Sequence, residues 1–192
     1  GAVCAAIGIV VGVVNSTGLG FRLGFMVTDG ALTIAENIFG LISWIPLVEL
    51  TLKDLTLFVS LVLIAVTCIM MGAGLPTTAL YIMLVTVAQP ALANLGIPPL
   101  ASHLFVLYYG VISEITPPVC ASVYAAAALA GANFWKVAGR ALVLAGAVYV
   151  VPFLFVFRPG ILAQGGTGQI VLDLGVASAA VFAVSVGLSG YF

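Results

Sequence analysis

The feature that most constrains this chain is residues 55–113, a long stretch without any Asp, Glu, Lys or Arg. A soluble domain carries about 25% charged residues, whereas this chain has 6% charged and 64% hydrophobic residues, with a mean hydropathy of +1.34. One bilayer crossing needs about 20 apolar residues in a helix, and the stretch is longer than that. These values predict an all-α integral membrane protein, a multi-span helical bundle in the lipid bilayer.

The remaining charges exclude a nucleic-acid-binding protein. The net charge is −1, and the five Lys and Arg residues are scattered along the chain instead of forming the basic patch that nucleic acid requires. The sequence also lacks the P-loop pattern G-x-x-x-x-G-K-[ST] and the hydrolase patterns H-E-x-x-H and G-x-S-x-G. A membrane enzyme would have to use Glu114 and the single histidine, His103, which makes it the weaker alternative.

Charged residues, prolines and glycines divide the chain into candidate helices. The predicted crossing segments are residues 2–21, 55–71, 79–95, 141–157 and 169–192. Between them we expect an interfacial or tilted helix over 26–48, a polar loop over 49–54 and a basic connector over 133–140. We expect residues 1–192 to be one transmembrane region of a longer protein, because the chain opens on Gly1 without a start methionine.

A double proline interrupts the apolar sequence at Ser113-Glu-Ile-Thr-Pro-Pro-Val119. Two consecutive prolines stop a helix, because each removes an N–H donor and crowds the preceding turn. Inside a membrane, broken backbone persists only where it is buried in protein or lines a wet cavity, and transporters place substrates and ions there. We therefore expect a re-entrant hairpin over residues 100–131, with arms at 100–113 and 118–130. A simple proline kink or an extramembrane turn is the alternative.

The tip of this predicted hairpin has the chemistry of an ion and anion site. The carbonyls that end the first arm carry the negative end of the helix dipole, which predicts a Na⁺ site at Ser113, Thr116 and Pro117. The N–H groups that begin the second arm would attract a carboxylate. The candidate substrate contacts are Glu114, Thr116, Pro118 and Ser122. A carboxylate in an apolar segment is usually functional, although Glu114 could instead face a wet vestibule.

Two further interruptions combine glycine with polar side chains. The segment Gly72-x-Gly74-x-Pro76-Thr-Thr78 predicts unwound backbone with hydroxyls nearby, and we expect Gly74 to contribute to a cation site. Close helix packing by small residues is the alternative. The segment Asn15-Ser-Thr17-Gly-Leu-Gly20 is either a second unwound segment or a helix C-cap.

Four motifs in combination resemble the large membrane subunit of tripartite ATP-independent periplasmic (TRAP) transporters. They are Gly72-Ala-Gly-Leu-Pro-Thr-Thr-Ala79, Pro98-Pro-Leu-Ala-Ser-His-Leu-Phe105, Tyr109-Gly-Val-Ile-Ser-Glu-Ile-Thr-Pro-Pro-Val119 and Val151-Pro-Phe-Leu-Phe155. The resemblance covers nearly the whole chain. Within the family, the chain is most similar to the type in which the large and small membrane subunits are fused in one polypeptide. It implies that this chain is the C-terminal half of a transport module. That module is an inverted repeat with two re-entrant hairpins and broken helices, and it moves as an elevator.

The resemblance also implies where the ions and the substrate bind. The motif Thr116-Pro117-Pro118 is similar to the tip of the second hairpin, which contributes to one Na⁺ site and to the substrate site. Asn15 and Thr17 fall where a broken helix would complete the other Na⁺ site, and residues 145–152 fall where the helix after the second hairpin is broken. The chain departs from unfused large subunits, which often carry an aspartate where it has Pro76.

With this resemblance, the sequence predicts a permease component that imports a small organic anion, a carboxylate, together with Na⁺. The resemblance implies a location in the bacterial inner membrane. It also implies two partners, a periplasmic binding protein that delivers the substrate and a small membrane subunit or its fused equivalent. A channel or structural subunit without ion coupling is the main alternative.

Overall fold

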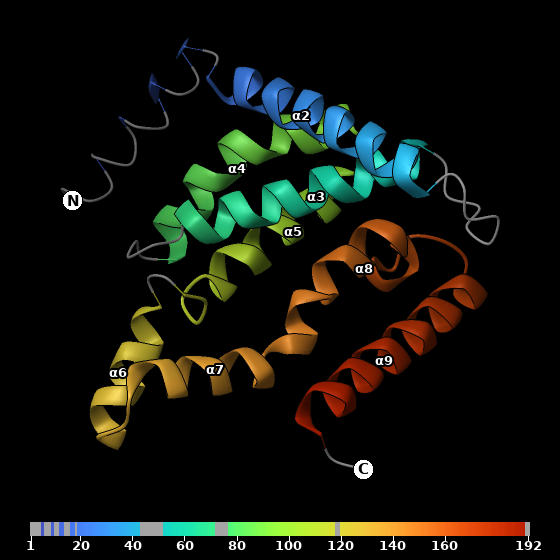
Figure 1. The fold of residues 1–192 in the computed structure, drawn as a ribbon. Helices are drawn as coiled ribbons and strands as arrows, with labels where there is room; N and C mark the ends of the chain where they lie inside the picture. The colour runs from blue at the N-terminus through green and yellow to red at the C-terminus, as the bar shows by residue number, and fades with distance from the viewer. Residues whose placement is uncertain are drawn as a thin grey trace.

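A computed structural model describes residues 19–42, 52–71, 77–117 and 120–190, together with 5, 9, 12–13 and 16–17. The regular secondary structure of these residues is helical, which confirms the predicted all-α class (Figure 1). The elements are α2 (Leu19–Ile42), α3 (Leu52–Met71), α4 (Thr77–Asn94), α5 (Pro99–Ile112), α6 (Ala121–Ala130), α7 (Phe134–Leu144), η1 (Gly146–Tyr149), α8 (Val151–Phe157), η2 (Pro159–Leu162) and α9 (Thr167–Ser189).

The lengths of the described helices agree with a membrane protein. Helix α3 and residues Thr167–Leu188 of α9 are each long and apolar enough to cross a bilayer, and α7 with α8 makes a third crossing if this bent pair counts as one. Helices α4, α5 and α6 are apolar but shorter. The crossing predicted at 79–95 is therefore helical but short, and the one predicted at 2–21 lies largely outside the described residues.

Helix α2 lies across α3 and α4 and packs against both (Figure 1). Ala31 and Ala35, one helical turn apart, are fully buried against Val59 of α3. The helix end predicted at residue 21 was wrong, because α2 continues from Leu19 through Arg22. The segment predicted as an interfacial or tilted helix over 26–48 is helical as far as Ile42. The charged side chains of α2 are exposed, so they occupy its outer face and do not interrupt the helix; they are Arg22, Asp29 and Glu36.

A tight turn joins α4 to α5, as the Gly-Ile-Pro-Pro sequence predicts. Gly96 has φ +78°, a conformation that glycine adopts without strain, and Pro99 starts α5. Helices α4 and α5 pack along each other, with Leu80, Leu84 and Phe105 almost fully buried between the elements. This pair brings the first residues of α4 close to the last residues of α5.

The predicted re-entrant hairpin over residues 100–131 stays a prediction. Both arms exist, as α5 and α6, but α6 packs against α7 while α5 packs against α3, α4 and α8. Figure 1 shows α6 leading away from α5. Helix α6 is mostly alanine, and Val123 and Tyr124 pack toward α7, where Tyr124 stacks on Phe134 with ring centroids 4.1 Å apart. The described residues thus show a broken backbone between two diverging helices.

The next helix is broken where the resemblance implied a break. Helix α7 ends at Leu144, η1 follows, and α8 begins at Val151, so that the helix is bent by 61° at this break. The predicted connector over 133–140 was wrong, because Asn133 caps a helix by accepting a hydrogen bond from the Trp135 N–H (2.9 Å). Lys136 and Arg140 are exposed on α7 and do not interrupt it.

Helix α9 is held against the preceding segment by a buried carboxylate. Asp173 is fully buried within this apolar helix. Its Oδ2 accepts a hydrogen bond from the Gly160 N–H (3.0 Å), and its Oδ1 pairs with the Arg158 guanidinium (3.2 Å). A side chain at Gly160 would collide with Asp173, so glycine permits the close approach.

Candidate functional site

The candidate site begins with a hydrogen bond between two interrupted segments. Thr77, the first residue of α4, donates its hydroxyl proton to Oε1 of Glu114, just after the end of α5, over 2.6 Å. Both side chains are half-buried. A short bond from a hydroxyl to a carboxylate is among the stronger hydrogen bonds in proteins. Thr77 and Glu114, which come from two separately predicted interruptions, are therefore in direct contact.

The turn after α5 uses most of the carbonyls that close the helix. Backbone N–H groups of Glu114, Ile115 and Thr116 each bond to the carbonyl three residues earlier, at 3.1–3.3 Å. Such bonds tighten the last turn of a helix and satisfy its end. The carbonyls of residues 111–113, at the predicted Na⁺ site, are therefore not unpaired: each accepts a backbone hydrogen bond. Each carbonyl oxygen has two lone pairs, so those that accept one bond can still accept another.

Thr116 links this turn to the break between α7 and α8. Its hydroxyl lies 2.7 Å from the carbonyl oxygen of Ile112 and 2.5 Å from the hydroxyl of Tyr149, the last residue of η1. The hydroxyl of Tyr109 on α5 donates to the backbone carbonyl of Tyr149 over 2.7 Å. The described breaks in the chain at 113–117 and 145–150 are thus joined by hydroxyl groups.

The other predicted site residues fall in different places. Ser113 is buried and donates its hydroxyl proton to the Gly110 carbonyl over 2.6 Å, while Pro117 is half-buried in the turn. Ser122 is exposed near the start of α6, and none of the hydrogen bonds of the described residues joins it to Glu114 or Thr116. Thr17 is exposed and donates to the Val13 carbonyl over 2.7 Å. Three predicted residues lie outside the described part: Asn15, Gly74 and Pro118.

The chemistry of this site is that of oxygen ligands. Among the described residues, no three His, Cys, Asp or Glu side chains gather as a metal-binding group. The site instead offers one carboxylate, hydroxyls and the carbonyls of a broken helix. Unwound backbone carbonyls and helix C-terminal ends hold Na⁺ or H⁺ in transporters. Such a set of oxygen ligands suits a small monovalent cation such as Na⁺.

His103 lies away from this site and is held by a structural contact. Its Nδ1 is 2.7 Å from the hydroxyl of Tyr81 on α4, within the interface between α4 and α5. Eleven residues separate it from Glu114, and a helix rises 1.5 Å per residue, so the two lie on the order of 16 Å apart. This separation argues against a catalytic pair of His103 and Glu114.

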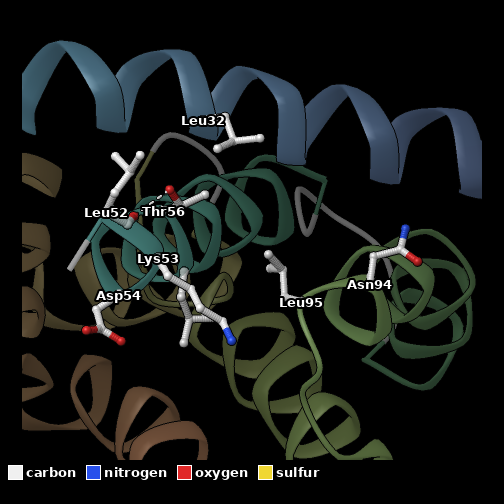
Figure 2. Close-up of a pocket in the computed structure, with 8 residues that line it drawn as sticks. Leu32, Leu52, Lys53, Asp54, Thr56, Asn94 and Leu95 are labelled. Carbon is white, nitrogen blue, oxygen red and sulfur yellow. Dashed lines mark hydrogen bonds between the residues drawn. The ribbon is translucent and has the colours of Figure 1, made fainter.

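A separate cavity of about 500 Å³ lies at the far end of α3 and α4 (Figure 2). Its lining is mainly apolar; the residues are Leu32, Leu52, Lys53, Asp54, Thr56, Leu57, Asn94 and Leu95. Helix α4 has 18 residues, so its far end lies about 27 Å from Thr77. The cavity contains none of the predicted site residues.

Three residues of these hydrogen-bond networks had no role predicted from the sequence. Thr77 was noted only as a hydroxyl within its segment, and Tyr149 gave no signal because tyrosine is common near membrane interfaces. Asp173 could have been found, since an acidic residue inside an apolar span is a functional or structural site by default. The same argument led to Glu114.

Comparisons with known proteins agree with the resemblance. A family model described as "Tripartite ATP-independent periplasmic transporter, DctM component" matches residues 1–169. No curated protein and no solved structure matches the chain. The matched range includes the whole candidate site and ends within the first residues of α9.

Proposed function

Because the chain belongs to the DctM family of tripartite ATP-independent periplasmic transporters, we propose that it couples the entry of Na⁺ to the import of a small carboxylate. The hydrogen bond between Thr77 and Glu114 carries this proposal, because it joins two helix interruptions that are far apart in the chain. A carboxylate is costly to place inside a membrane protein, and Glu114, unlike Asp173, sits at a helix break and has no ion pair in the described residues. An ion-coupled site explains why it is there.

The broken backbone supplies ligands for the cation. The carbonyls that close α5 point toward the turn, and the helix dipole adds partial negative charge at this end. Ser113 and Thr116 place hydroxyl oxygens beside the same turn. We assign the Na⁺ site to this turn, with Thr116 as a direct ligand and Glu114 nearby as the compensating charge. Pro117, Pro118 and Gly74 are its proposed backbone contributors, and Asn15 and Thr17 belong to a second proposed Na⁺ site.

The substrate is proposed to bind next to this ion. A bound cation would balance the Glu114 carboxylate and make the turn attractive to an organic anion. Pro118 and Ser122, at the entry to α6, are the proposed contacts for the substrate carboxylate, because N–H groups at a helix start bind anions. The proposed partners are a periplasmic binding protein, which delivers the anion, and a small membrane subunit, which completes the permease in the inner membrane.

Replacing Thr116 by valine tests the cation site. Valine keeps the shape of threonine but removes the hydroxyl oxygen, so we expect the Na⁺ concentration for half-maximal uptake to rise about three- to tenfold, as one lost polar contact implies. The measurement is initial uptake rate against Na⁺ at saturating substrate.

A matched control for this variant is Thr67→Val on α3. Thr67 is exposed and, like Thr116, donates to the carbonyl four residues earlier (2.8 Å). It lies outside the proposed site, so its Na⁺ dependence should match that of the natural protein. An unchanged Na⁺ dependence in Thr116→Val would remove Thr116 from the site.

The rival channel function makes a different prediction. A channel conducts its solute down a gradient, so an imposed Na⁺ gradient would not concentrate the carboxylate inside vesicles. A symporter accumulates the carboxylate above its outside concentration until the Na⁺ gradient is spent. Measurement of the final internal concentration therefore separates the two functions.

A further inference from the structure

Tyr149 is the residue through which the break between α7 and α8 contacts the turn after α5. Its hydroxyl meets Thr116 and its backbone carbonyl accepts the hydroxyl of Tyr109. We propose that Tyr149 is a positioning residue that holds the Thr116 hydroxyl oxygen in place for the cation. This inference rests on the proposed function, because it assumes that Thr116 is an ion ligand.

The direction of the hydrogen bonds follows from counting protons. Thr116 has one hydroxyl proton, and its oxygen lies 2.7 Å from the Ile112 carbonyl, which can only accept. Thr116 therefore donates to Ile112, and Tyr149 must donate to Thr116. The Thr116 oxygen then keeps one lone pair that bears no proton, and this lone pair is available to a cation.

Aromatic packing holds Tyr149 in register with α5. The ring of Phe153, one turn after Tyr149, meets Phe105 edge to face with centroids 5.6 Å apart, and Tyr109 at 6.1 Å. Phe155 packs in the same way against Tyr108, at 5.2 Å. Helix α8 is therefore fixed on α5 independently of the Tyr149 hydroxyl. Removal of that hydroxyl should release the turn without undocking the helix.

The same network connects the ion site to the shape of the broken helix. Tyr149 is the last residue of η1, the segment that follows directly on the 61° bend between Leu144 and Gly146. A change in this angle would move the Tyr149 hydroxyl and, with it, Thr116. Ion affinity would then depend on the geometry of α7 and α8, which carry none of the other proposed ligands.

The test compares Tyr149→Phe with Tyr108→Phe in the complete permease purified in detergent. Tyr108 also packs through its ring on α8, so its phenylalanine variant controls for the loss of a hydroxyl from this interface. Na⁺ affinity is read from the unfolding temperature as NaCl replaces choline chloride, because a bound ion stabilises the folded state. This measurement needs no knowledge of the substrate.

The Na⁺ midpoint is the Na⁺ concentration that gives half of the full rise in unfolding temperature. We expect Tyr149→Phe to raise this midpoint about three- to tenfold and Tyr108→Phe to change it less than about twofold. The double variant Tyr149→Phe/Thr116→Val should bind Na⁺ no more weakly than Thr116→Val alone, since both changes act through one oxygen. If Tyr149→Phe does not fold, Tyr109→Phe replaces it, with an expected rise of about two- to fivefold because it frees the Tyr149 carbonyl.

Three outcomes would overturn the inference. The Na⁺ midpoint of Tyr149→Phe, or of Tyr109→Phe in its place, could stay unchanged while Thr116→Val weakens binding. The variant could lower the unfolding temperature equally with and without Na⁺, which is a structural role only. A lower midpoint would show that the Tyr149 hydroxyl competes with the ion. The absence of any Na⁺ effect on the natural protein would instead contradict the proposed function itself.

Discussion

Glu114→Gln is expected to reduce Na⁺-driven uptake at least tenfold. Glutamine has nearly the same size as glutamate and can still accept the proton of Thr77, but it removes the negative charge that balances the cation. Hydrogen bonds to a charged group contribute about 1.5–3 kcal/mol, and about 1.4 kcal/mol corresponds to a tenfold change in affinity. The measurement is initial uptake rate over a range of Na⁺ and substrate concentrations.

The control and the partner variant make this test specific. Glu36→Gln removes an exposed carboxylate from α2 and should leave uptake unchanged. Thr77→Val removes the other half of the bond to Glu114. In a double-mutant cycle the two changes should be clearly non-additive, because the residues are in direct contact. Natural kinetics in Glu114→Gln would reduce Glu114 to a structural residue.

Asp173→Ala is expected to have the second large effect, on stability. The change removes the acceptor of the Gly160 N–H and the partner of Arg158, and it leaves a small gap in a fully buried position. A buried donor without an acceptor costs about 1–3 kcal/mol. For a chain of this size that corresponds to a decrease of about 2–12 °C in unfolding temperature.

Two variants check this interpretation by thermal unfolding in detergent. Asp173→Asn keeps an oxygen for the Gly160 N–H and should recover part of the lost stability. Asp29→Ala removes an exposed carboxylate on α2 and should change the unfolding temperature little. An Asp173→Ala protein as stable as the natural one would show that the carboxylate does not hold α9 in place.

The membrane class and the break after α5 could be predicted from the sequence, because both depend on local chemistry. The break between α7 and α8 was implied only by the family resemblance. Low charge predicts helices in lipid, and Pro117 follows the end of α5 as a helix-stopping residue should. Glu114 was found because an acid is costly in an apolar segment. These inferences need only the residue and its neighbours.

The errors came from features that depend on packing between elements. Arg22 was expected to end a helix, yet an exposed arginine continues α2, and exposed Lys136 does the same in α7. The contact of Thr77 with Glu114 joins residues 37 positions apart. It depends on how α4 packs along α5, which hydrophobicity alone does not determine.

The most direct test of the central claim is transport by the complete permease in liposomes. The assay supplies the periplasmic binding protein outside and a panel of labelled dicarboxylates, keto acids and sugar acids, at one membrane potential. We expect at least one carboxylate to accumulate above its outside concentration only with both an inward Na⁺ gradient and the binding protein. Equal accumulation when choline replaces Na⁺ would contradict the Na⁺ site at Thr116 and Glu114.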